Sequence, residues 1–408
     1  MSISRRSFLA GSAAVAAARQ LGSMETAATP TAVSRAREFD PWLEIDAAAI
    51  AHNVRTIASL TRVESGPARP IIAVAKNNAY GCGIATAGPL LDRLSDVTAF
   101  AVVRPDEAFA LRAAAVKKPI LLMGPVSDDE AIELSRQDVR LAPYAPEHAS
   151  QLVRVAKRLG RPVRVHLYID TGMHRMGMPH DRVLAWLNDG GLRRAISVEG
   201  AFTELTEDQD FDREQARRLT GLSDAVRAKS SSLGRLHAAS SDAVAQRTSE
   251  TFLDAVRTGL TIYGGYPTPD MMARGELRPV YRLKARVIRV DELAAGEGSS
   301  YHRRFRATEP LRTATLALGH VDGYPTGAVK GCVVSIRGRL RPVIGTVSAS
   351  HTVVSLGDDP TVRVGDEAIA VGSDDPAIHP NEVAKRSDWS EYNMFMHLNP
   401  ALRRVVLT

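Results

Sequence analysis

The sequence predicts an α/β protein in which a (β/α)8 barrel of the TIM type is followed by a C-terminal all-β domain. Two observations carry this prediction. Apolar segments of strand length alternate with helical patterns eight times, which fits a closed barrel better than an open sheet. The helical patterns stop near Glu276, and short β-branched runs separated by glycine and proline follow. The eight strand segments are 71–75, 98–103, 119–123, 139–142, 163–169, 196–202, 235–239 and 256–263.

These patterns assign the barrel domain to residues 40–275 and the β domain to residues 276–408. Ahead of the first unit, residues 42–46 alternate between apolar and polar side chains, as a short strand does. Asp46 ends this strand. It is expected to cap a helix over 47–60, because aspartate accepts hydrogen bonds from the free N–H groups at a helix start.

Residues 1–35 are predicted to be an export signal and leader outside the fold. Arg5 and Arg6 precede a small, apolar, alanine-rich run that ends at Ala18, a pattern typical of a twin-arginine signal. That run is too short to span a bilayer, so no stable membrane anchor is expected. The predicted location is therefore periplasmic, and a disordered basic tail is the alternative interpretation.

The composition is that of an ordinary soluble globular protein, with 44% hydrophobic and 24% charged residues. The net charge is +6, but basic residues are scattered among acidic ones, so nucleic-acid binding is not expected. The two cysteines, Cys82 and Cys332, are predicted to be free thiols, with a bridge between them as the alternative. No HExxH motif or cysteine pair indicates a metal site.

Lys76 is the first candidate functional residue, because it ends the apolar run 71–75. Barrel enzymes keep their chemistry at the carboxyl ends of such strands. Partial burial there would lower the pKa of the Lys76 amine and favour Schiff-base formation. A solvated lysine at a strand end is the alternative. The following Gly81-Cys82-Gly83 is not a dinucleotide fingerprint, since Thr86 stands where a third glycine is needed.

Six motifs, in order along the chain, resemble those of the alanine racemase family. They are residues 75–81, 166–177, 237–241, 256–264, 299–301 and 319–324. The similarity runs from about residue 42 to residue 405, nearly the whole chain beyond the leader. It implies a fold-type III enzyme that binds pyridoxal 5'-phosphate and works on a small amino-acid substrate. It also implies a head-to-tail homodimer with shared active sites.

The resemblance implies two catalytic residues. Lys76 would hold the cofactor as a Schiff base and move the α-proton on one face, and Tyr301 of the partner subunit would work on the other face. Inversion needs two bases, since one base returns the proton to the side it came from. To act as a base, Tyr301 needs a nearby cation that stabilises its phenolate. The alternative is a tyrosine that only packs in the β domain.

The resemblance also implies the cofactor contacts. Arg257 would face the pyridine nitrogen, where a guanidinium donates but does not give up its proton, which argues for racemisation over decarboxylation. Arg175 would lie near the phenolic oxygen and the substrate carboxylate. A structural role remains the alternative for both arginines. His237 would lie behind the ring, or be a core histidine. The implied phosphate cradle is Tyr80, Ser241, Gly259 and Leu260, and Ser241 alternatively only caps a helix.

Several positions depart from the family pattern. Tyr168 stands where a lysine usually steadies Arg175, and Glu204 where a histidine usually contacts Arg257. Asn399-Pro400 stands where a phosphate-binding tyrosine is expected. Ala349 replaces a methionine and His320 a tyrosine, and with Arg175 both are expected to contact substrate. Because alanine is smaller than methionine, the site should be enlarged.

These departures and the export signal favour a periplasmic racemase that accepts amino acids larger than alanine, as exported broad-specificity members of the family do. Three alternatives stay open. One is a racemase confined to alanine. Another is a fold-type III lyase, which Arg257 disfavours. The last is a racemase-like protein that binds pyridoxal phosphate with little or no turnover.

Overall fold

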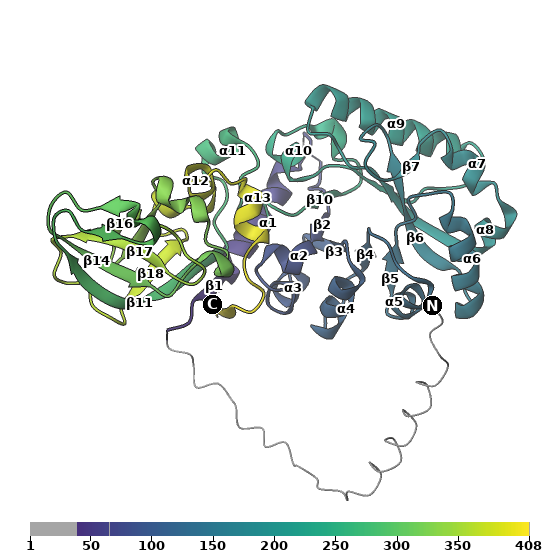
Figure 1. The fold of residues 1–408 in the computed structure, drawn as a ribbon. Coiled ribbons are helices and arrows are strands. Elements are labelled where there is room, and N and C mark those ends of the chain that lie inside the picture. The colour runs from purple at the N-terminus through teal and green to yellow at the C-terminus, as the bar shows by residue number, and fades with distance from the viewer. Residues whose placement is uncertain (1–38, 65, 408) are drawn as a thin grey trace, which may run out of the picture. The chain divides into compact units, whose positions relative to one another are not determined.

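The structure is a computed structural model that describes residues 39–64 and 66–407 (Figure 1). The predicted export signal lies outside these residues. Eight parallel strands form the barrel, in the spatial order β10-β2-β3-β4-β5-β6-β8-β9. A single parallel bridge between His237 and Ala255 joins its last and first strands. The strands are β2 (Ile71–Val74), β3 (Val97–Val102), β4 (Ile120–Leu122), β5 (Val139–Leu141), β6 (Val163–Asp170), β8 (Ile196–Phe202), β9 (Arg235–His237) and β10 (Val256–Thr258).

The predicted barrel strands are confirmed, and the last predicted segment, 256–263, is the one whose length differs most. Its strand ends at Thr258 because the chain turns at Gly259, where the N–H of Ile262 donates to the Gly259 carbonyl at 2.8 Å. The N–H of Tyr263 then donates to the Leu260 carbonyl at 3.1 Å. The apolar run continues past the strand because these turn residues are themselves buried.

Helices between the strands cover the outside of the barrel (Figure 1). Asp46 caps the first of them as predicted, since its Oδ1 accepts from the N–H of Ala49 at 2.8 Å. The helices are α1 (Ala47–Leu60), α3 (Ile84–Asp92), α4 (Pro105–Ala113), α5 (Asp128–Arg136), α6 (His148–Leu159), α7 (Val183–Leu187), α8 (Gly190–Ala195), α9 (Gln209–Arg227) and α10 (Ser241–Ala245). The segment labelled α2 (Lys76–Tyr80) is a left-handed turn directly after β2. A two-residue strand, β7 (Met178–Pro179), pairs with β6.

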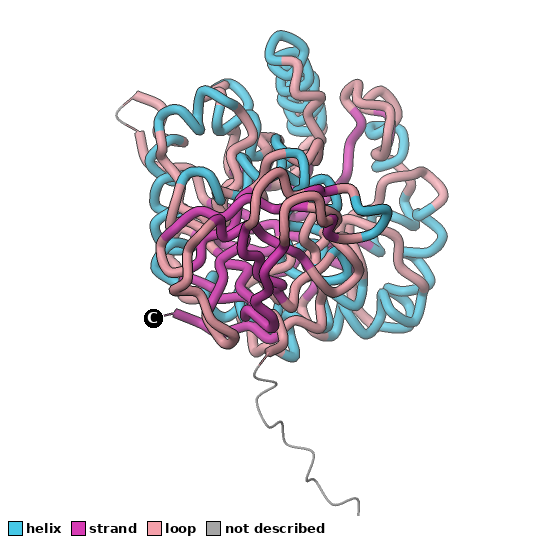
Figure 2. The backbone as a smooth tube through the Cα atoms, turned by 60° about the vertical axis from the view of Figure 1, so that its left-hand side comes forward, coloured by secondary structure: helices cyan, strands magenta, loops and turns pink. Residues whose placement is uncertain are grey.

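The second sheet forms the β domain, whose strands lie in front in Figure 2. Its order is β14-β17-β16-β15-β18-β11, and a further pairing of β14 with β11 closes these six strands on themselves. They are β11 (Tyr281–Leu293), β14 (Leu311–Leu316), β15 (Val333–Ile336), β16 (Arg339–Ile344), β17 (Thr352–Gly357) and β18 (Glu367–Val371). A small hairpin of β12 (Gly298–Ser299) and β13 (Phe305–Arg306) extends from it.

Both ends of the described chain join this second sheet. Strand β1 (Trp42–Asp46) pairs antiparallel with β11 and parallel with β19 (Arg403–Leu407). The predicted barrel range of 40–275 therefore begins with a strand of the other sheet. The alternation of residues 42–46 predicts a strand but does not indicate its partner.

The β domain also contains short helices that the sequence patterns did not predict. They are α12 (Pro380–Arg386) and α13 (Glu391–Met396), and α11 (Pro269–Arg274) precedes the domain. Helices of six or seven residues make fewer than two turns, so no apolar periodicity identifies them. Among the described residues, no helix combines the length and apolar character that crossing a bilayer requires.

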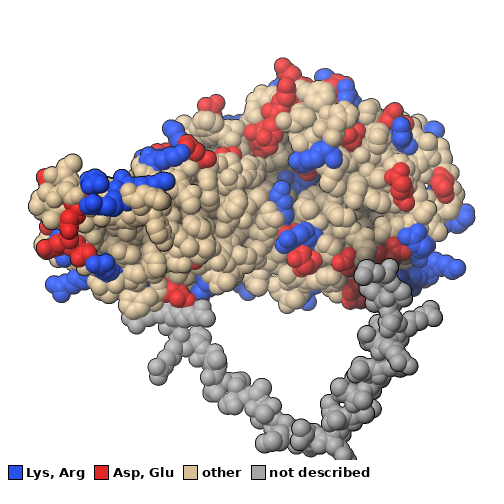
Figure 3. Space-filling model, in the orientation of Figure 1, with Lys and Arg blue, Asp and Glu red and all other residues tan. Residues whose placement is uncertain are grey.

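Buried apolar side chains of the barrel and of the β domain belong to one continuous core cluster. Both cysteines are buried and free, as predicted. On the face in Figure 3, lysine and arginine side chains lie interspersed with aspartate and glutamate.

Candidate active site

Lys76 lies directly beyond β2 and opens a turn of unusual backbone conformation. The next four residues, 77–80, all have positive φ, between 50° and 56°. An L-residue pays roughly 1–2 kcal/mol for this left-handed conformation, and only asparagine, aspartate and glycine adopt it easily. Asn77 and Asn78 meet that preference, but Ala79 and Tyr80 do not. The surrounding structure must therefore hold this turn.

Glu107, near the start of α4, holds the turn from the barrel side. Its Oε1 accepts from the N–H of Asn77 at 2.5 Å, and its Oε2 accepts from the N–H groups of Val103 and Arg104, both at 3.0 Å. Glu107 is buried, so these charge-assisted bonds replace its hydration. The sequence analysis missed this residue. The available signal was an acidic residue two positions after Pro105, since proline and acidic residues are common in the first turn of a helix.

The C-terminal segment of the β domain holds the turn from the other side. Arg404 of β19 donates to the carbonyl of Gly81. The amide of Asn77 lies 3.0 Å from the sulfur of Met396 in α13. A Cβ at Gly81, whose φ is +75°, would stand 2.3 Å from the carbonyl oxygen of Phe395. A glycine is therefore required where the turn meets α13.

Arg257, on β10, is buried and rigidly held. Its Nη1 lies 2.9 Å from Nδ1 of His237, and its Nη2 donates to the Thr203 carbonyl at 3.0 Å and to Oε1 of Glu204 at 2.7 Å. The guanidinium also lies over the ring of Phe202, 4.9 Å from its centroid. The structure thus confirms that Glu204 contacts Arg257.

The contact with Arg257 fixes the tautomers of two histidines. Because a guanidinium only donates, Nδ1 of His237 accepts, and its Nε2 carries the hydrogen. That Nε2 lies 3.0 Å from Nδ1 of His166, which accepts in turn. Burial lowers the pKa of His166 to about 4 and the pKa of His237 well below its usual value, so both rings are neutral. His237 stacks on Phe202 with 5.1 Å between centroids.

Arg175 follows β6 and contacts the carboxylate of Glu204, which also binds Arg257. Its Nη2 lies 3.4 Å from Oε2 of Glu204, and it is near enough to the Tyr168 phenol to act on the pKa of that group. Arg175 is 59% exposed, so most of its donors face solvent. Burial raises the pKa of the Tyr168 phenol.

Lys76 shares the electrostatic environment of these groups. Burial is the largest cause that lowers the pKa of its amine, and the charges of Arg175 and Arg257 lower it further. The carboxylate of Glu204 acts in the opposite direction. The pKa of Glu204 itself is lowered, because the charges of Arg257 and Arg175 outweigh its burial. The site thus brings a desolvated amine together with the guanidiniums of Arg175 and Arg257 and the carboxylates of Glu204 and Glu107.

A polar cradle lies where β9 and β10 end. Ser241 Oγ accepts from the N–H of Gly259 at 3.1 Å and lies 3.1 Å from Oγ1 of Thr261. A Cβ at Gly259 would stand 2.3 Å from the hydroxyl of Tyr80. Tyr80 stacks on Tyr263, with centroids 4.9 Å apart. The structure therefore brings Tyr80, Ser241 and Gly259 together, and Leu260 follows in the same buried turn.

Sequence reasoning missed three hydroxyl groups in this region. Thr261 bonds to Ser241, and Oγ1 of Thr258 is buried without a hydrogen-bond partner. Tyr392 of α13 is near enough to Tyr80 to raise its pKa. Threonines within a buried run and a tyrosine in a helix too short to predict left no usable signal.

The remaining predicted residues, Tyr301, His320 and Ala349, lie in the β domain. Tyr301 sits in the β12–β13 hairpin and is 69% exposed. It lines a groove of about 700 Å³ together with His320, Ala349 and Arg304. All residues that line this groove belong to the range 301–389. Within one chain, the structure therefore groups Lys76 with Arg175 and Arg257 but places Tyr301 in a separate groove.

Among the residues described, no group of three or more histidine, cysteine, aspartate or glutamate side chains could hold a metal ion.

Comparisons with known proteins match both domains. A family model for the N-terminal domain of alanine racemase matches residues 45–267, and one for its C-terminal domain matches residues 280–406. The alanine racemase of Desulfovibrio desulfuricans is 31% identical over 370 residues, which cover 89% of this chain and 97% of that protein. The alanine racemase of Geobacter sulfurreducens is 30% identical over 373 residues, covering 89% and 96%.

Solved structures agree. The alanine racemase from D-cycloserine-producing Streptomyces lavendulae superposes with a TM-score of 0.82 at 25% identity, covering 91% of this chain and 97% of that one. The alanine racemase from Bacillus anthracis with bound L-Ala-P gives a TM-score of 0.80 at 26% identity, covering 91% and 95%.

Proposed function

This chain belongs to the alanine racemase family, and from that premise we propose that it racemises amino acids larger than alanine as well as alanine itself, as a periplasmic homodimer. It is a pyridoxal phosphate-dependent amino-acid racemase, an isomerase. The breadth of substrate, the dimer, the location and the roles of individual residues are the proposal. The single observation that carries the breadth is the small side chain of Ala349 in the groove beside Tyr301.

The residues present fit pyridoxal phosphate. The Lys76 amine would hold its aldehyde, and the hydroxyls of Tyr80, Ser241 and Thr258 would hold its phosphate with the N–H of Gly259. Two observations support this fit. Oγ1 of Thr258 is buried without a partner, and any side chain at Gly259 would collide with the Tyr80 hydroxyl. When bound, the cofactor withdraws electrons from the α-carbon of an amino acid, which makes the α-proton removable.

Lys76 acts on one face of the substrate. Burial and two neighbouring guanidiniums lower the pKa of its amine, so the neutral form that accepts a proton is more populated than in a solvated lysine. The left-handed turn aims this amine, and Glu107 with the C-terminal segment fixes the turn.

Arg257 sets the outcome of the reaction. Its guanidinium is anchored by His237, Thr203 and Glu204, so it presents a fixed cation that keeps its proton. It would donate a hydrogen bond to the ring nitrogen of the cofactor without transferring a proton. Weak electron withdrawal favours prompt return of the α-proton over decarboxylation.

Tyr301 acts on the other face, and a second copy of the chain supplies it. The groove that contains Tyr301 includes no residue of the Lys76 site, so the two bases do not meet within one chain. Arg304 lines the same groove and would be the cation on the Tyr301 side of the shared site. A head-to-tail homodimer would place each groove over the barrel of its partner.

The breadth of substrate follows from the same groove. A methionine at position 349 would fill space that alanine leaves open, and His320 is shorter than the tyrosine it replaces. The periplasmic location is supported by Arg5, Arg6 and the alanine-rich run that follows, which lie in a part of the chain outside the described residues.

Individual L-amino acids incubated with the cofactor-loaded protein in heavy water test this function. Chiral chromatography follows the D-isomer, and mass spectrometry follows α-deuterium. D-isomers of large amino acids are expected. Inversion of alanine alone would restrict the enzyme to alanine, and deuterium without inversion would mean that Tyr301 is inactive. If neither the D-isomer nor α-deuterium forms from any amino acid, racemisation is contradicted and a binding protein or a lyase is favoured.

A further inference from the structure

Glu204 connects two arginines that differ greatly in burial. Its Oε1 binds Arg257, which is 4% exposed, and its Oε2 faces Arg175, whose side chain is 59% exposed. Within residues 39–64 and 66–407, Glu204 is the only carboxylate that forms an ion pair with either guanidinium. One carboxylate therefore joins a buried, hydrogen-bonded cation to an exposed one.

The backbone of Glu204 is itself anchored. Gln215, which is fully buried, donates from its Nε2 to the Glu204 carbonyl at 2.9 Å and to Oγ1 of Thr171 at 3.2 Å. Thr171 in turn lies 2.7 Å from Oγ1 of Thr203, the residue before Glu204. Glu204 is thus held at its main-chain carbonyl and at Oε1, and its Oε2 contacts the exposed Arg175.

The two contacts have different lengths. The 2.7 Å bond to Arg257 has the length of a strong charge-assisted hydrogen bond, whereas the 3.4 Å contact to Arg175 is longer. The longer contact restrains Arg175 but engages only one of its five N–H donors. Because the Arg175 side chain is largely exposed, it can still offer a carboxylate ligand a two-point bond.

We propose that Glu204 is a positioning residue, a shared carboxylate that orients Arg175 toward the substrate carboxylate by tying it to the buried Arg257. The identity of the substrate rests on the function proposed above, but the positioning does not require turnover. Glu204 also partly neutralises the cations around Lys76, because its charge opposes those of Arg175 and Arg257 at the amine.

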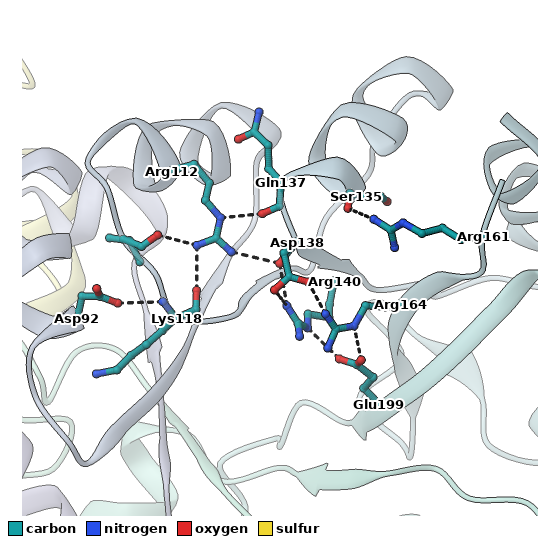
Figure 4. Close-up of polar contacts among 11 residues, drawn as sticks. Asp92, Arg112, Lys118, Ser135, Gln137, Asp138, Arg140, Arg161, Arg164 and Glu199 are labelled. Carbon is teal, nitrogen blue, oxygen red and sulfur yellow. Dashed lines mark hydrogen bonds and ion pairs between the residues drawn. The ribbon is translucent and has the colours of Figure 1, made fainter. Parts of the chain in front are cut away.

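Glu204→Gln in the cofactor-loaded full-length protein tests the proposal, because glutamine keeps the shape and removes the charge. Glu199→Gln is the matched control. Glu199 also bridges two arginines, Arg140 and Arg164 (Figure 4), but it lies within β8, and neither of these arginines belongs to the Lys76 site. Propionate, a carboxylate without an amine, is the probe. Calorimetry measures its dissociation constant without any need for turnover.

The proposal predicts that Glu204→Gln weakens propionate binding about tenfold, the effect of one charge-assisted contact. The midpoint of the pH titration of the bound cofactor's absorbance should also fall. Removing a negative charge beside a cationic nitrogen lowers its pKa. Glu199→Gln should lower the melting temperature but leave both the dissociation constant of propionate and the midpoint of the absorbance titration unchanged.

Unchanged propionate binding and an unchanged midpoint in Glu204→Gln would overturn the proposal, and so would equal changes in the Glu199 control. If Glu204→Gln does not fold, Glu204→Asp replaces it. The shorter side chain should keep the pH midpoint and weaken propionate binding, and wild-type propionate binding by that variant would overturn the proposal. If the spectral and binding changes occur but no amino acid is racemised, the proposed function fails and the positioning role stands.

Discussion

Arg404, in the last strand, donates two hydrogen bonds to the carbonyl of Gly81, at 2.7 Å from Nη2 and 3.2 Å from Nε. Its Nη1 also donates to the carbonyls of Pro400 and Leu402, at 2.8 Å and 2.6 Å. One guanidinium therefore joins the C-terminal segment to the turn that carries Lys76. At Pro400, where the family resemblance leads one to expect a phosphate-binding hydroxyl, the backbone instead supports this arginine.

Arg404→Ala should lower the free energy of unfolding by about 2 kcal/mol or more, because several carbonyls lose a charged donor. It should also increase the dissociation constant of pyridoxal phosphate, since the left-handed turn loses its outer support. Denaturant unfolding and fluorescence titration of the apoprotein measure the two effects. Arg404→Lys should show nearly the same losses of stability and cofactor affinity as Arg404→Ala, because an ammonium cannot reproduce the planar arrangement of guanidinium donors. The neighbouring Arg403, which faces Trp42, is the control, and equal losses in Arg403→Ala would contradict the assignment.

Gly259→Ala should impair cofactor binding more than folding. The added methyl would stand 2.3 Å from the Tyr80 hydroxyl, which lines the predicted phosphate cradle. We expect at least a tenfold rise in the dissociation constant of pyridoxal phosphate, measured on the apoprotein. Gly221→Ala is the control, because nothing lies within 4 Å of the added methyl in α9. It should leave cofactor binding unchanged and stabilise the helix by up to about 1 kcal/mol. Normal cofactor binding by Gly259→Ala would refute the position of the cradle.

Ala349→Met should narrow the substrate range. A methionine would occupy the groove beside Tyr301, so kcat/KM for L-methionine should fall about tenfold or more, the scale of discrimination by a filled apolar pocket. The value for L-alanine should change far less. Chiral chromatography of parallel reactions measures both. Ser350→Met adds the same side chain one residue beyond, at an exposed position outside the groove, and should leave both values unchanged. Unaltered selectivity in Ala349→Met would count against the enlarged pocket.

His166→Gln should make the protein less sensitive to acid. The pKa of His166 is about 4 in the fold against 6.5 in the unfolded chain. As the pH falls below 6.5, the unfolded chain therefore binds a proton that the folded chain does not, and stability decreases. Between pH 7 and pH 5 the lowered pKa of His166 should reduce the free energy of unfolding by about 2 kcal/mol. Glutamine does not titrate, and its amide oxygen can accept a hydrogen bond from His237. Between pH 7 and pH 5 the free energy of unfolding of the variant should therefore fall by about 2 kcal/mol less than that of the unaltered protein. Urea unfolding at both pH values checks this, with the exposed His351→Gln as control.

The sequence predicts the barrel well because each parallel strand is buried on both faces and so appears as an apolar run. The run 71–75 and the stop at Lys76 are examples. The same reasoning cannot assign β1 to its sheet, because the alternation of residues 42–46 fits any half-buried edge. It also cannot find α12 and α13, which are stabilised by tertiary contacts rather than by a periodic face.

At the site, the motifs identify residue types and their order, which suffices to name Lys76, Arg257 and Ser241 as candidates, and their roles stay predictions. They do not reveal the left-handed turn, because nothing in Ala79 or Tyr80 favours positive φ. Nor do they reveal Glu107, whose role depends on a contact across thirty residues of chain. The expected contact of Glu204 with Arg257 is confirmed, but its second contact, with Arg175, depends on where two separate loops meet.

The pairing of β1 with β19 joins the beginning and the end of the described chain in one sheet. The sheet of the β domain therefore includes β1, which precedes the barrel along the chain, and β19, which follows all other strands of the β domain. During synthesis the sheet cannot be completed until residues 403–407 are made, and Arg404 reaches the lysine turn only at that stage. A nascent chain that lacks Arg404 would hold an unsupported cofactor site, so high affinity for pyridoxal phosphate should appear only once residue 407 has left the ribosome.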